Sequence, residues 1–463
     1  MKITLFGAAG NVTGSAYHIQ SKNSEILVDF GIFQGDRSLE SHNHILPPIN
    51  LSKLQAVIIT HAHLDHTGRL PLLVRNGYSG PIYATEATIE ISEIILKDSA
   101  RLQSYELIRT NRKRARSGEP QLEPDYAEED VQKVVDQFTP ISYNKHIEVA
   151  PGVLARVREA GHILGSVSIE LTVEENGKKK VIIFSGDLGP QGMAILKDPD
   201  PFHSADLVFM ESTYGDHDHR SLEETLLEGK EIVQKAIEQK GIILVPSFAI
   251  GRSQQLLYYM ARAVHRGTLP GIPVYLDSPM AIEASRIYLN HNELYDDEMV
   301  GMFSSGAIKG DFSKMNLSVT AEDSKALTAV EGPCMIIAGA GMCNAGRILH
   351  HLRNNLSKAE TTVMMVGYQG NGSLGRRLLD GAKTVRIFGE EIEVNAHIAS
   401  MGGLSAHAGQ SDLLNWFDKV SASKPKLVLS HGEDKGRKPL AEIIRKRYGI
   451  TPILPEYGEV ITL

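Results

Sequence analysis

The sequence predicts an α/β fold in which buried strands alternate with amphipathic helices. Short apolar runs recur along the whole chain, and longer stretches with apolar residues at helical spacing lie between them. This alternation is the pattern of layered α/β proteins. The expected strands cover residues 56–60, 181–185, 207–210, 242–245, 274–276, 335–338, 363–366 and 427–429.

The clearest helix is predicted for residues 221–239. Ser221 can cap its first turn, Glu224 follows three residues later, and apolar positions then repeat at helical spacing. Residues 251–263 and 345–355 have similar patterns.

The longest stretch without a strand pattern, residues 86–136, is expected to be an excursion of helices. It carries the densest basic cluster of the chain, and the simplest interpretation of such a cluster is a solvated helix face. The cluster consists of Arg109, Arg112, Lys113, Arg114 and Arg116.

Composition limits the number of domains and the kinds of partner that the chain can have. The chain has 463 residues, of which 42% are hydrophobic and 22% charged, so it holds material for two or three folded domains and is not disordered. The 48 Lys and Arg against 56 Asp and Glu give a net charge of −8, which taken alone argues against nucleic acid as a partner. Two cysteines cannot form a disulfide framework. With no secretory leader pattern and no long apolar run, we expect a cytoplasmic protein that does not contact membranes.

One strand end carries a dense set of metal-ligand side chains. The run 56–60 is followed by His61, His63, Asp65 and His66 within six positions. Imidazole and carboxylate are ligands of zinc, and this spacing lets alternate residues face two neighbouring metals. Because such polar groups are costly in a buried strand end, packing does not explain them.

Further candidate ligands follow other strand patterns. His162 lies in a glycine-flanked turn, Asp187 follows the run VIIFSG, and His431 ends the run LVLS. The C-terminal ends of strands are where α/β proteins place their sites. Each residue alone is equally well a turn or cap residue, but together with the first set they predict one site.

The order of these motifs resembles the metallo-β-lactamase superfamily, and specifically its β-CASP ribonuclease branch. The motifs are Asp29 in ILVDFG, the run HAHLDH, His162, Asp187, Glu211 in FMESTYGDH, His407 in GGLSAHAGQ and His431 in SHGED. The stretches around Arg252, Asp277 and Arg347 also resemble that branch, so the match covers the whole chain. The chain is similar to bacterial relatives of the endonuclease subunit of the cleavage and polyadenylation specificity factor.

The resemblance implies an αββα metallo-β-lactamase sandwich with an inserted α/β β-CASP domain. The expected boundaries are residues 1–205 for the first part of the sandwich, 206–385 for the insert and 386–463 for the last part. Substrate would then lie between the two domains.

The resemblance also implies a ligand set and a mechanism. His61, His63 and His162 would bind one zinc ion, Asp65, His66 and His431 the other, and Asp187 would bridge them. The metals would generate a hydroxide that attacks a phosphodiester, with Mn²⁺ or Fe²⁺ as metals that suit similar ligands. Other roles are implied for residues beside the metals: His407, held by Glu211, as general acid; Asp29 as the carboxylate that orients a ligand imidazole; and Ser405, Arg252 and Arg347 as substrate-binding residues.

In this branch a histidine at the position of His431 goes with RNA enzymes, so the resemblance implies RNA as the substrate. Closed domains would leave room for a single strand and not a duplex. The two metal half-sites, together with His407 and His431, make endonucleolytic cleavage the expected activity. The alternatives are a 5′-to-3′ exoribonuclease, a small-ester or thioester hydrolase of the same fold, and a non-catalytic RNA-processing scaffold. The sequence leaves the oligomeric state open, with a dimer allowed.

Overall fold

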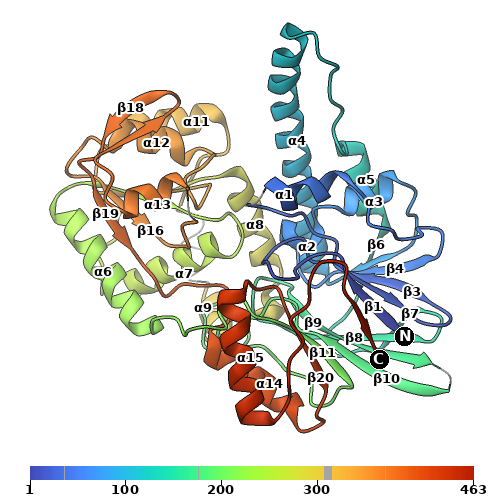
Figure 1. The fold of residues 1–463 in the computed structure, drawn as a ribbon. Coiled ribbons are helices and arrows are strands. Elements are labelled where there is room, and N and C mark those ends of the chain that lie inside the picture. Colours follow the sequence, from blue (N-terminus) through green and yellow to red (C-terminus); the bar gives the residue numbers. More distant parts are fainter. Residues whose placement is uncertain (36, 176, 307–314, 371) are drawn as a thin grey trace. The chain divides into compact units, whose positions relative to one another are not determined.

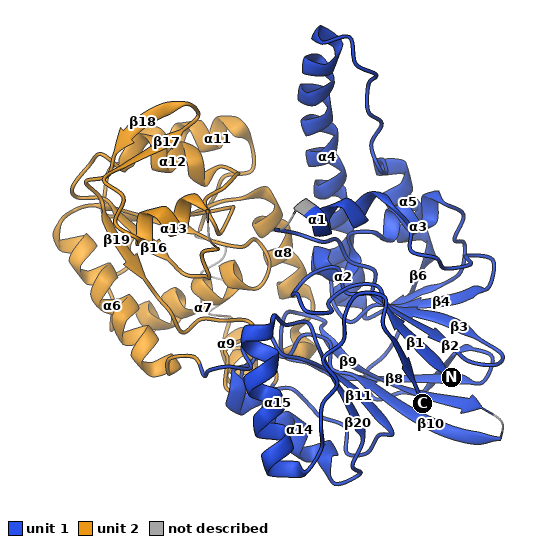
Figure 2. Ribbon diagram, viewed as in Figure 1, with its two compact units in different colours: residues 1–191, 198–218, 407–463 blue, residues 192–197, 219–406 orange. Residues whose placement is uncertain are grey.

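The computed structural model describes residues 1–35, 37–175, 177–306, 315–370 and 372–463. The chain divides into two compact units (Figure 2). Unit 1 comprises residues 1–191, 198–218 and 407–463, and unit 2 comprises residues 192–197 and 219–406.

Two sheets form the centre of unit 1 (Figure 1). In the described chain the first has the order β21-β1-β2-β3-β4-β5-β6, and its strands from β3 to β6 are parallel. Its strands are β1 (Lys2–Leu5), β2 (Tyr17–Gln20), β3 (Glu25–Val28), β4 (Leu54–Ile58), β5 (Ile82–Ala84), β6 (Phe138–Pro140) and β21 (Val460–Thr462).

The second sheet of unit 1 has the order β20-β11-β10-β9-β8-β7, in which β10, β11 and β20 are parallel. Its strands are β7 (Ile147–Ala150), β8 (Val153–Glu159), β9 (Val167–Glu175), β10 (Lys178–Phe184), β11 (Leu207–Glu211) and β20 (Lys426–Ser430).

Three apolar layers hold unit 1 together. The central one lies between the two sheets, where side chains such as Ile58 and Val28 face Ile169 and Phe184. A second layer packs helices on the outer face of the first sheet, and a third packs α14 and α15 on the outer face of the second. The helices are α1 (Arg37–Glu40), α2 (Leu64–Thr67), α3 (Leu70–Arg75), α4 (Glu86–Arg116), α5 (Glu128–Gln137), α14 (Gln410–Ser421) and α15 (Asp434–Tyr448). The predicted αββα sandwich is confirmed.

Unit 2 is an α/β domain around a parallel sheet of order β14-β13-β15-β12-β16-β19. Its apolar strands pack against helices on the sheet's face, with Ile336 and Val363 against Ile348 and Leu352. The strands are β12 (Ile242–Pro246), β13 (Val274–Asp277), β14 (Asn316–Leu317), β15 (Cys334–Ala338), β16 (Thr362–Met365), β19 (His397–Ser400) and the separate hairpin β17 (Thr384–Ile387) and β18 (Glu390–Glu393). The helices are α6 (Leu222–Glu238), α7 (Arg252–His265), α8 (Pro279–Asn290), α9 (Asp297–Ser304), α11 (Ala321–Ala326), α12 (Ile348–Asn355) and α13 (Leu374–Leu379).

The boundaries between the two units lie at other residues than the expected 205 and 385. Strand β11 pairs with β10 and β20 in the second sheet, so unit 1 continues to residue 218. Strand β19 pairs with β16, so unit 2 continues to residue 406.

The stretch 86–136 is helical, as predicted. It forms α4, which projects from unit 1 in Figure 2, and α5. Across the described ranges, we find no helix with both the length and the apolar character that a membrane span requires.

Candidate active site

The predicted ligand residues of unit 1 follow the C-terminal ends of parallel strands. His61 follows β4, Asp187 follows β10 and His431 follows β20. Glu211 is the last residue of β11. Because β10, β11 and β20 are parallel, their C-terminal ends share one edge of the second sheet. His61, after β4 of the first sheet, and His162, in the turn after β8, join them there.

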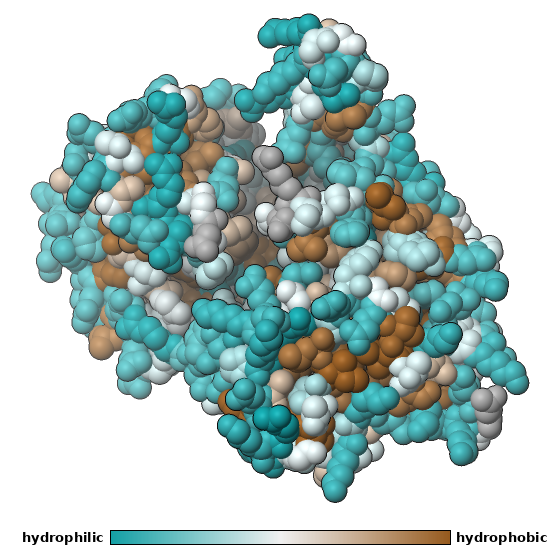
Figure 3. Space-filling view, viewed as in Figure 1, coloured by the Kyte–Doolittle hydropathy of each residue, from teal (hydrophilic) through white to brown (hydrophobic). Residues whose placement is uncertain are grey.

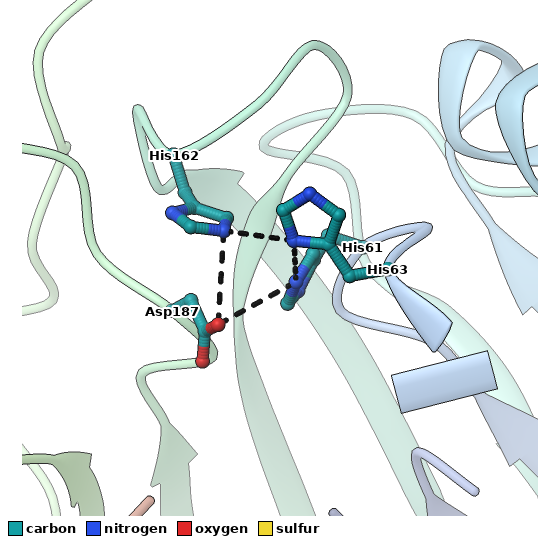
Figure 4. A group of neighbouring side chains, drawn as sticks. All are labelled: His61, His63, His162 and Asp187. Atoms are coloured by element: carbon teal, nitrogen blue, oxygen red, sulfur yellow. Dashed lines mark hydrogen bonds and ion pairs between the residues drawn. The ribbon is translucent and has the colours of Figure 1, made fainter. Parts of the chain in front are cut away.

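A first group of donor atoms comes from His61, His63, His162 and Asp187 (Figure 4). His63 Nδ1 lies 3.2 Å from His61 Nε2 and 3.1 Å from His162 Nε2. Asp187 Oδ2 lies 3.6 Å from His61 Nε2 and 3.7 Å from His162 Nε2. Three imidazole nitrogens and one carboxylate oxygen therefore converge on one point.

A second group comes from Asp65, His66, Asp187 and His431. His66 Nε2 lies 3.4 Å from His431 Nε2, 3.7 Å from Asp65 Oδ2 and 3.4 Å from Asp187 Oδ1. Asp65 Oδ2 lies 3.3 Å from His431 Nε2. Asp187 thus presents one oxygen to each group.

Both groups fit a metal ion. A tetrahedral site with bonds of about 2.0–2.1 Å has ligand-to-ligand edges of about 3.3–3.4 Å. The distances above scatter around that value. In addition, the buried Asp187 Oδ1 accepts no hydrogen bond from the described residues, which is costly unless a cation neutralises it. The arrangement is that of a dinuclear metal site.

Electrostatics favour the protonation states that metal ligands need at four of the donor residues. Burial lowers the pKa of His61 and of His63, so both imidazoles are neutral. Burial would raise the pKa of Asp187, but the neighbouring His431, His66 and His61 hold it well below the usual value. Burial acts in the same way on Asp65, yet His66 and His431 lower its pKa to about 2. Neutral imidazoles and ionised carboxylates are the forms that bind metal. The exception is His66: burial would lower its pKa, but the carboxylates of Asp187, Asp29 and Asp65 raise it well above the usual value, so a metal ion bound there would displace a proton.

Side chains behind the ligands fix their orientation. Asp29 Oδ2 lies 2.7 Å from His66 Nδ1, and its two oxygens accept hydrogen bonds from the backbone N–H and the hydroxyl of Thr60, each at 2.8 Å. Thr213 Oγ1 lies 3.1 Å from His431 Nδ1. At His66, Nδ1 is engaged from behind, which leaves Nε2 directed at the second donor group. At His431, Nδ1 also lies 3.5 Å from Asp187 Oδ1, while Nε2 faces Asp65 and His66.

The backbone at the site is tightly constrained. Asp29 and His431 have φ values of 56° and 47°, a left-handed conformation that is costly for residues other than glycine. Gly31 has no room for a side chain, because a Cβ there would lie 1.6 Å from the Asp65 carbonyl oxygen. The loop after β3 therefore packs directly on the turn that carries Asp65 and His66.

His407 and Glu211 lie beside the two donor groups. His407 Nδ1 is 3.2 Å from Glu211 Oε1 and 3.9 Å from Asp187 Oδ2. The Glu211 carboxylate is buried and accepts hydrogen bonds from the backbone N–H groups of Leu188 and Thr213. Burial would lower the pKa of His407, but Glu211 and Asp187 raise it to about 9. His407 can therefore carry a proton at neutral pH.

The three predicted substrate-binding residues belong to unit 2. Arg252 is buried at the start of α7, and Ser405 is partly buried two residues before His407. The Arg347 guanidinium donates to Asp277 Oδ1 and to the Ser318 carbonyl, each at 2.8 Å. These contacts give Arg347 a structural role within unit 2, and the substrate contacts of all three residues stay predictions.

Sequence reasoning missed Thr60 and Thr213. Thr60 precedes the HAHLDH run, and Thr213 is two residues after Glu211. A hydroxyl residue next to a ligand motif was the available signal, since such residues often hold the back of a ligand histidine.

Comparison with known proteins agrees with this geometry. Three family models match, described as "Metallo-beta-lactamase superfamily" (residues 9–228), "Beta-Casp domain" (253–378) and "Zn-dependent metallo-hydrolase RNA specificity domain" (391–455). Ribonuclease TTHA0252 of Thermus thermophilus is 38% identical, over 99% of both chains. Transcription termination factor FttA of Methanosarcina mazei is 26% identical, over 97% of this chain and 70% of its own. The crystal structure of a protein of unknown function from Enterococcus faecalis V583 has the same fold, with a TM-score of 0.57, 15% identity and coverage of 100% of this chain and 99% of its own.

Fold and site together define a metal-dependent hydrolase with a dinuclear centre in an αββα sandwich. The chain belongs to the β-CASP ribonuclease branch of the metallo-β-lactamase superfamily.

Proposed function

We propose that the protein is a zinc-dependent endoribonuclease that hydrolyses phosphodiester bonds of single-stranded RNA. The observation that carries this proposal is the shared carboxylate of Asp187, whose two oxygens face two separate donor groups with His407 beside them. The RNA specificity described for the family model over residues 391–455 and the name of the Thermus relative support RNA as the substrate.

His61, His63 and His162 would hold one ion, Asp65, His66 and His431 the other, and Asp187 both. Two such ions supply an activated water and polarise the phosphoryl oxygens of a bound phosphodiester. Zinc is favoured over Mn²⁺ because the donor spacing fits tetrahedral sites rich in imidazole.

The residues of the chain supply the proton. His407 keeps its proton at neutral pH because Glu211 and Asp187 face its ring, and its side chain is 23% exposed, so a leaving oxygen can reach it. Glu211 itself is fixed by backbone N–H groups and orients the ring through Nδ1. His407 Nε2 is then the atom that donates the proton to the leaving oxygen.

The test is cleavage of an unstructured RNA oligonucleotide by zinc-loaded protein. We expect Asp187→Ala to lose both the metal and cleavage, and His407→Ala to keep the metal and lose turnover. The control is His350→Ala, which changes an exposed histidine of α12. No cleavage by the wild type, or equal cleavage by Asp187→Ala, would refute the proposal.

Two further outcomes distinguish the alternatives. RNA labelled at the 5′ end should give internal fragments from the first turnover, whereas immediate release of mononucleotides would identify an exoribonuclease. Turnover of a small thioester with no cleavage of RNA would identify the hydrolase alternative.

A further inference from the structure

Helix α4 begins beside the active site and continues far beyond it. The Thr85 and Thr88 hydroxyls at its start donate to the Gly165 carbonyl at 2.8 and 2.9 Å, and Gly165 belongs to the turn that carries His162. At about 1.5 Å per residue, Arg109 lies about 35 Å and Arg116 about 45 Å along the helix from Glu86. The outer part of α4 and the segment that returns from it (residues 101–127) are called the arm below, and its surface is mostly hydrophilic in Figure 3.

One face of the arm helix is covered by the returning segment. Asn111 exchanges two hydrogen bonds with the backbone of Leu122, each at 2.9 Å, and Arg114 Nε donates to the Pro120 carbonyl. With Gln103 and Leu107, these helix residues are only partly exposed. At about 100° per residue, positions 103, 107, 111 and 114 fall within about 80° around the helix axis.

The opposite face is an exposed basic stripe. Tyr105, Arg109, Arg112 and Arg116 are all exposed and fall within about 60° around the axis, directly opposite the covered face. Tyr105 is 71% exposed. The stripe is therefore an ordered row of one aromatic ring and three guanidinium groups.

The arm helix carries mostly positive charge. Residues 101–116 contain six Lys and Arg and one acidic residue, Glu106. Within the described chain, the arm arginines that form ion pairs are Arg101, which pairs with Glu128 at the base, and Arg114, which pairs with Glu119 on the covered face. The three stripe arginines are left to bind an external anion.

We propose that this stripe binds the phosphates of single-stranded RNA whose scissile bond lies at the metal site, an inference that rests on the proposed function. The stripe arginines rise along the axis in steps of about 4.5 and 6 Å, which suits successive phosphates of one strand. Tyr105 adds a face on which a base can stack. Leu102 and Ile108, which are 56% and 51% exposed, flank Tyr105, but beyond Ile108 the stripe continues as three arginines. A row of guanidinium groups fits a polyanion better than it fits the apolar centre of a protein interface.

The length of α4 makes the proposal quantitative. At about 3.4 Å per nucleotide of a stacked strand, the stripe lies about 10 to 13 nucleotides from the helix start. An RNA of about four nucleotides at the metal site cannot reach it, whereas one of about 30 nucleotides can.

The experiment compares zinc-loaded wild type with the triple variant Arg109→Gln, Arg112→Gln, Arg116→Gln. Glutamine keeps the helix propensity and removes three charges. The matched control, Lys22→Gln, Lys178→Gln, Lys179→Gln, removes three exposed charges elsewhere on unit 1. Each protein is assayed on unstructured RNAs of about 4 and about 30 nucleotides, and helicity is checked by circular dichroism.

We expect the stripe variant to raise KM for the long RNA by about 10- to 100-fold at 0.1 M salt and to lower the slope of log K against log salt by about 2, with kcat unchanged. All three proteins should cleave the short RNA equally. Equal KM for the long RNA in stripe variant and wild type, or equal losses on both lengths, would refute the stripe.

Direct binding of the long RNA separates this inference from the proposed function. One outcome is that neither the wild type nor the variants cleave RNA, while the stripe variant binds the long RNA about 10- to 100-fold more weakly than the wild type, the loss expected for about three phosphate contacts. In that case the stripe is supported and the ribonuclease proposal fails. If RNA binding is unchanged and the variant instead loses an association with an acidic protein or a second copy, the stripe is a protein contact and the inference is wrong.

Discussion

Asp29→Asn probes how the metal site is held without touching a metal ligand. Asp29 Oδ2 lies 2.7 Å from His66 Nδ1, and the same carboxylate accepts two hydrogen bonds from Thr60. Asparagine keeps the size and one acceptor oxygen. Its amide group, however, turns N–H donors toward His66, so the imidazole is driven to the tautomer with its proton on Nε2. That nitrogen faces the second donor group and can no longer bind metal there.

The size of the effect follows from the lost contact. A hydrogen bond to a charged group contributes about 1.5–3 kcal/mol. At about 1.4 kcal/mol per factor of ten, its loss weakens binding of the second metal by about 10- to 150-fold. The range observed when partners behind metal ligands are removed, about 10- to 100-fold, is the same.

The assay is metal competition with a chromogenic chelator, followed by a count of bound metal. The chain offers a matched control in Asp125→Asn, since Asp125 pairs with His44 Nδ1 at 2.8 Å on an exposed surface. We expect one of two metals to weaken in Asp29→Asn and neither in the control. Wild-type affinity for both metals in Asp29→Asn would refute the orienting role of the carboxylate.

Three further predictions concern the proton donor, unit 2 and the site loop. The Glu211 carboxylate helps to raise the pKa of His407 to about 9, so kcat for cleavage should fall as the pH rises through that region. In a pH–kcat profile, Glu211→Gln should move this alkaline fall to lower pH, and an unmoved fall would contradict His407 as the general acid. Asp277→Asn removes the negative charge that His351, Arg347 and Ser324 contact at 2.6 to 2.8 Å. Thermal unfolding should show unit 2 destabilised by about 3–5 kcal/mol, with metal content unchanged. An unshifted melting curve would show that this carboxylate does not stabilise unit 2. Gly31→Ala places a Cβ against the Asp65 carbonyl, so the variant should lose the second metal or fail to fold, and a fully loaded, stable protein would contradict the packing described.

Much of this fold is readable in the sequence because its strands are short, apolar and separated by capped helices. The predicted helix at 221–239 is α6, with Ser221 accepting from the Glu224 N–H as the capping pattern required. The donor residues could be predicted as a set because they follow strand patterns or lie in a turn between them, and α/β proteins place their sites at the C-terminal ends of strands.

Other features depend on long-range contacts that no local pattern encodes. The unit boundaries follow from the pairing of β11 with β20 and of β19 with β16, partners that are more than 30 residues apart. The motif around Arg347 predicted that this residue binds substrate. Its Nη1 and Nη2 groups instead donate to Asp277 and to two backbone carbonyl groups. The basic cluster in α4 was visible in the sequence, but only the returning segment decides which of its arginines stay exposed.

The net charge of −8 therefore says little about whether the protein can bind a polyanion. Four of its carboxylates, Asp29, Asp65, Asp187 and Glu211, surround the proposed metal site, where two divalent ions would bring a charge of about +4. Position also decides the local field on the arm. Three arginines share one exposed face, whereas the acids of the returning segment, Glu119, Glu123 and Asp125, pair with Arg114, Arg75 and His44. Screening limits such fields to about 10 Å at 0.1 M salt, so an RNA strand on the stripe responds to the nearby charges of the arm and not to the net charge of the whole chain. Binding should consequently depend on salt through these few residues, whatever the sign of the total charge.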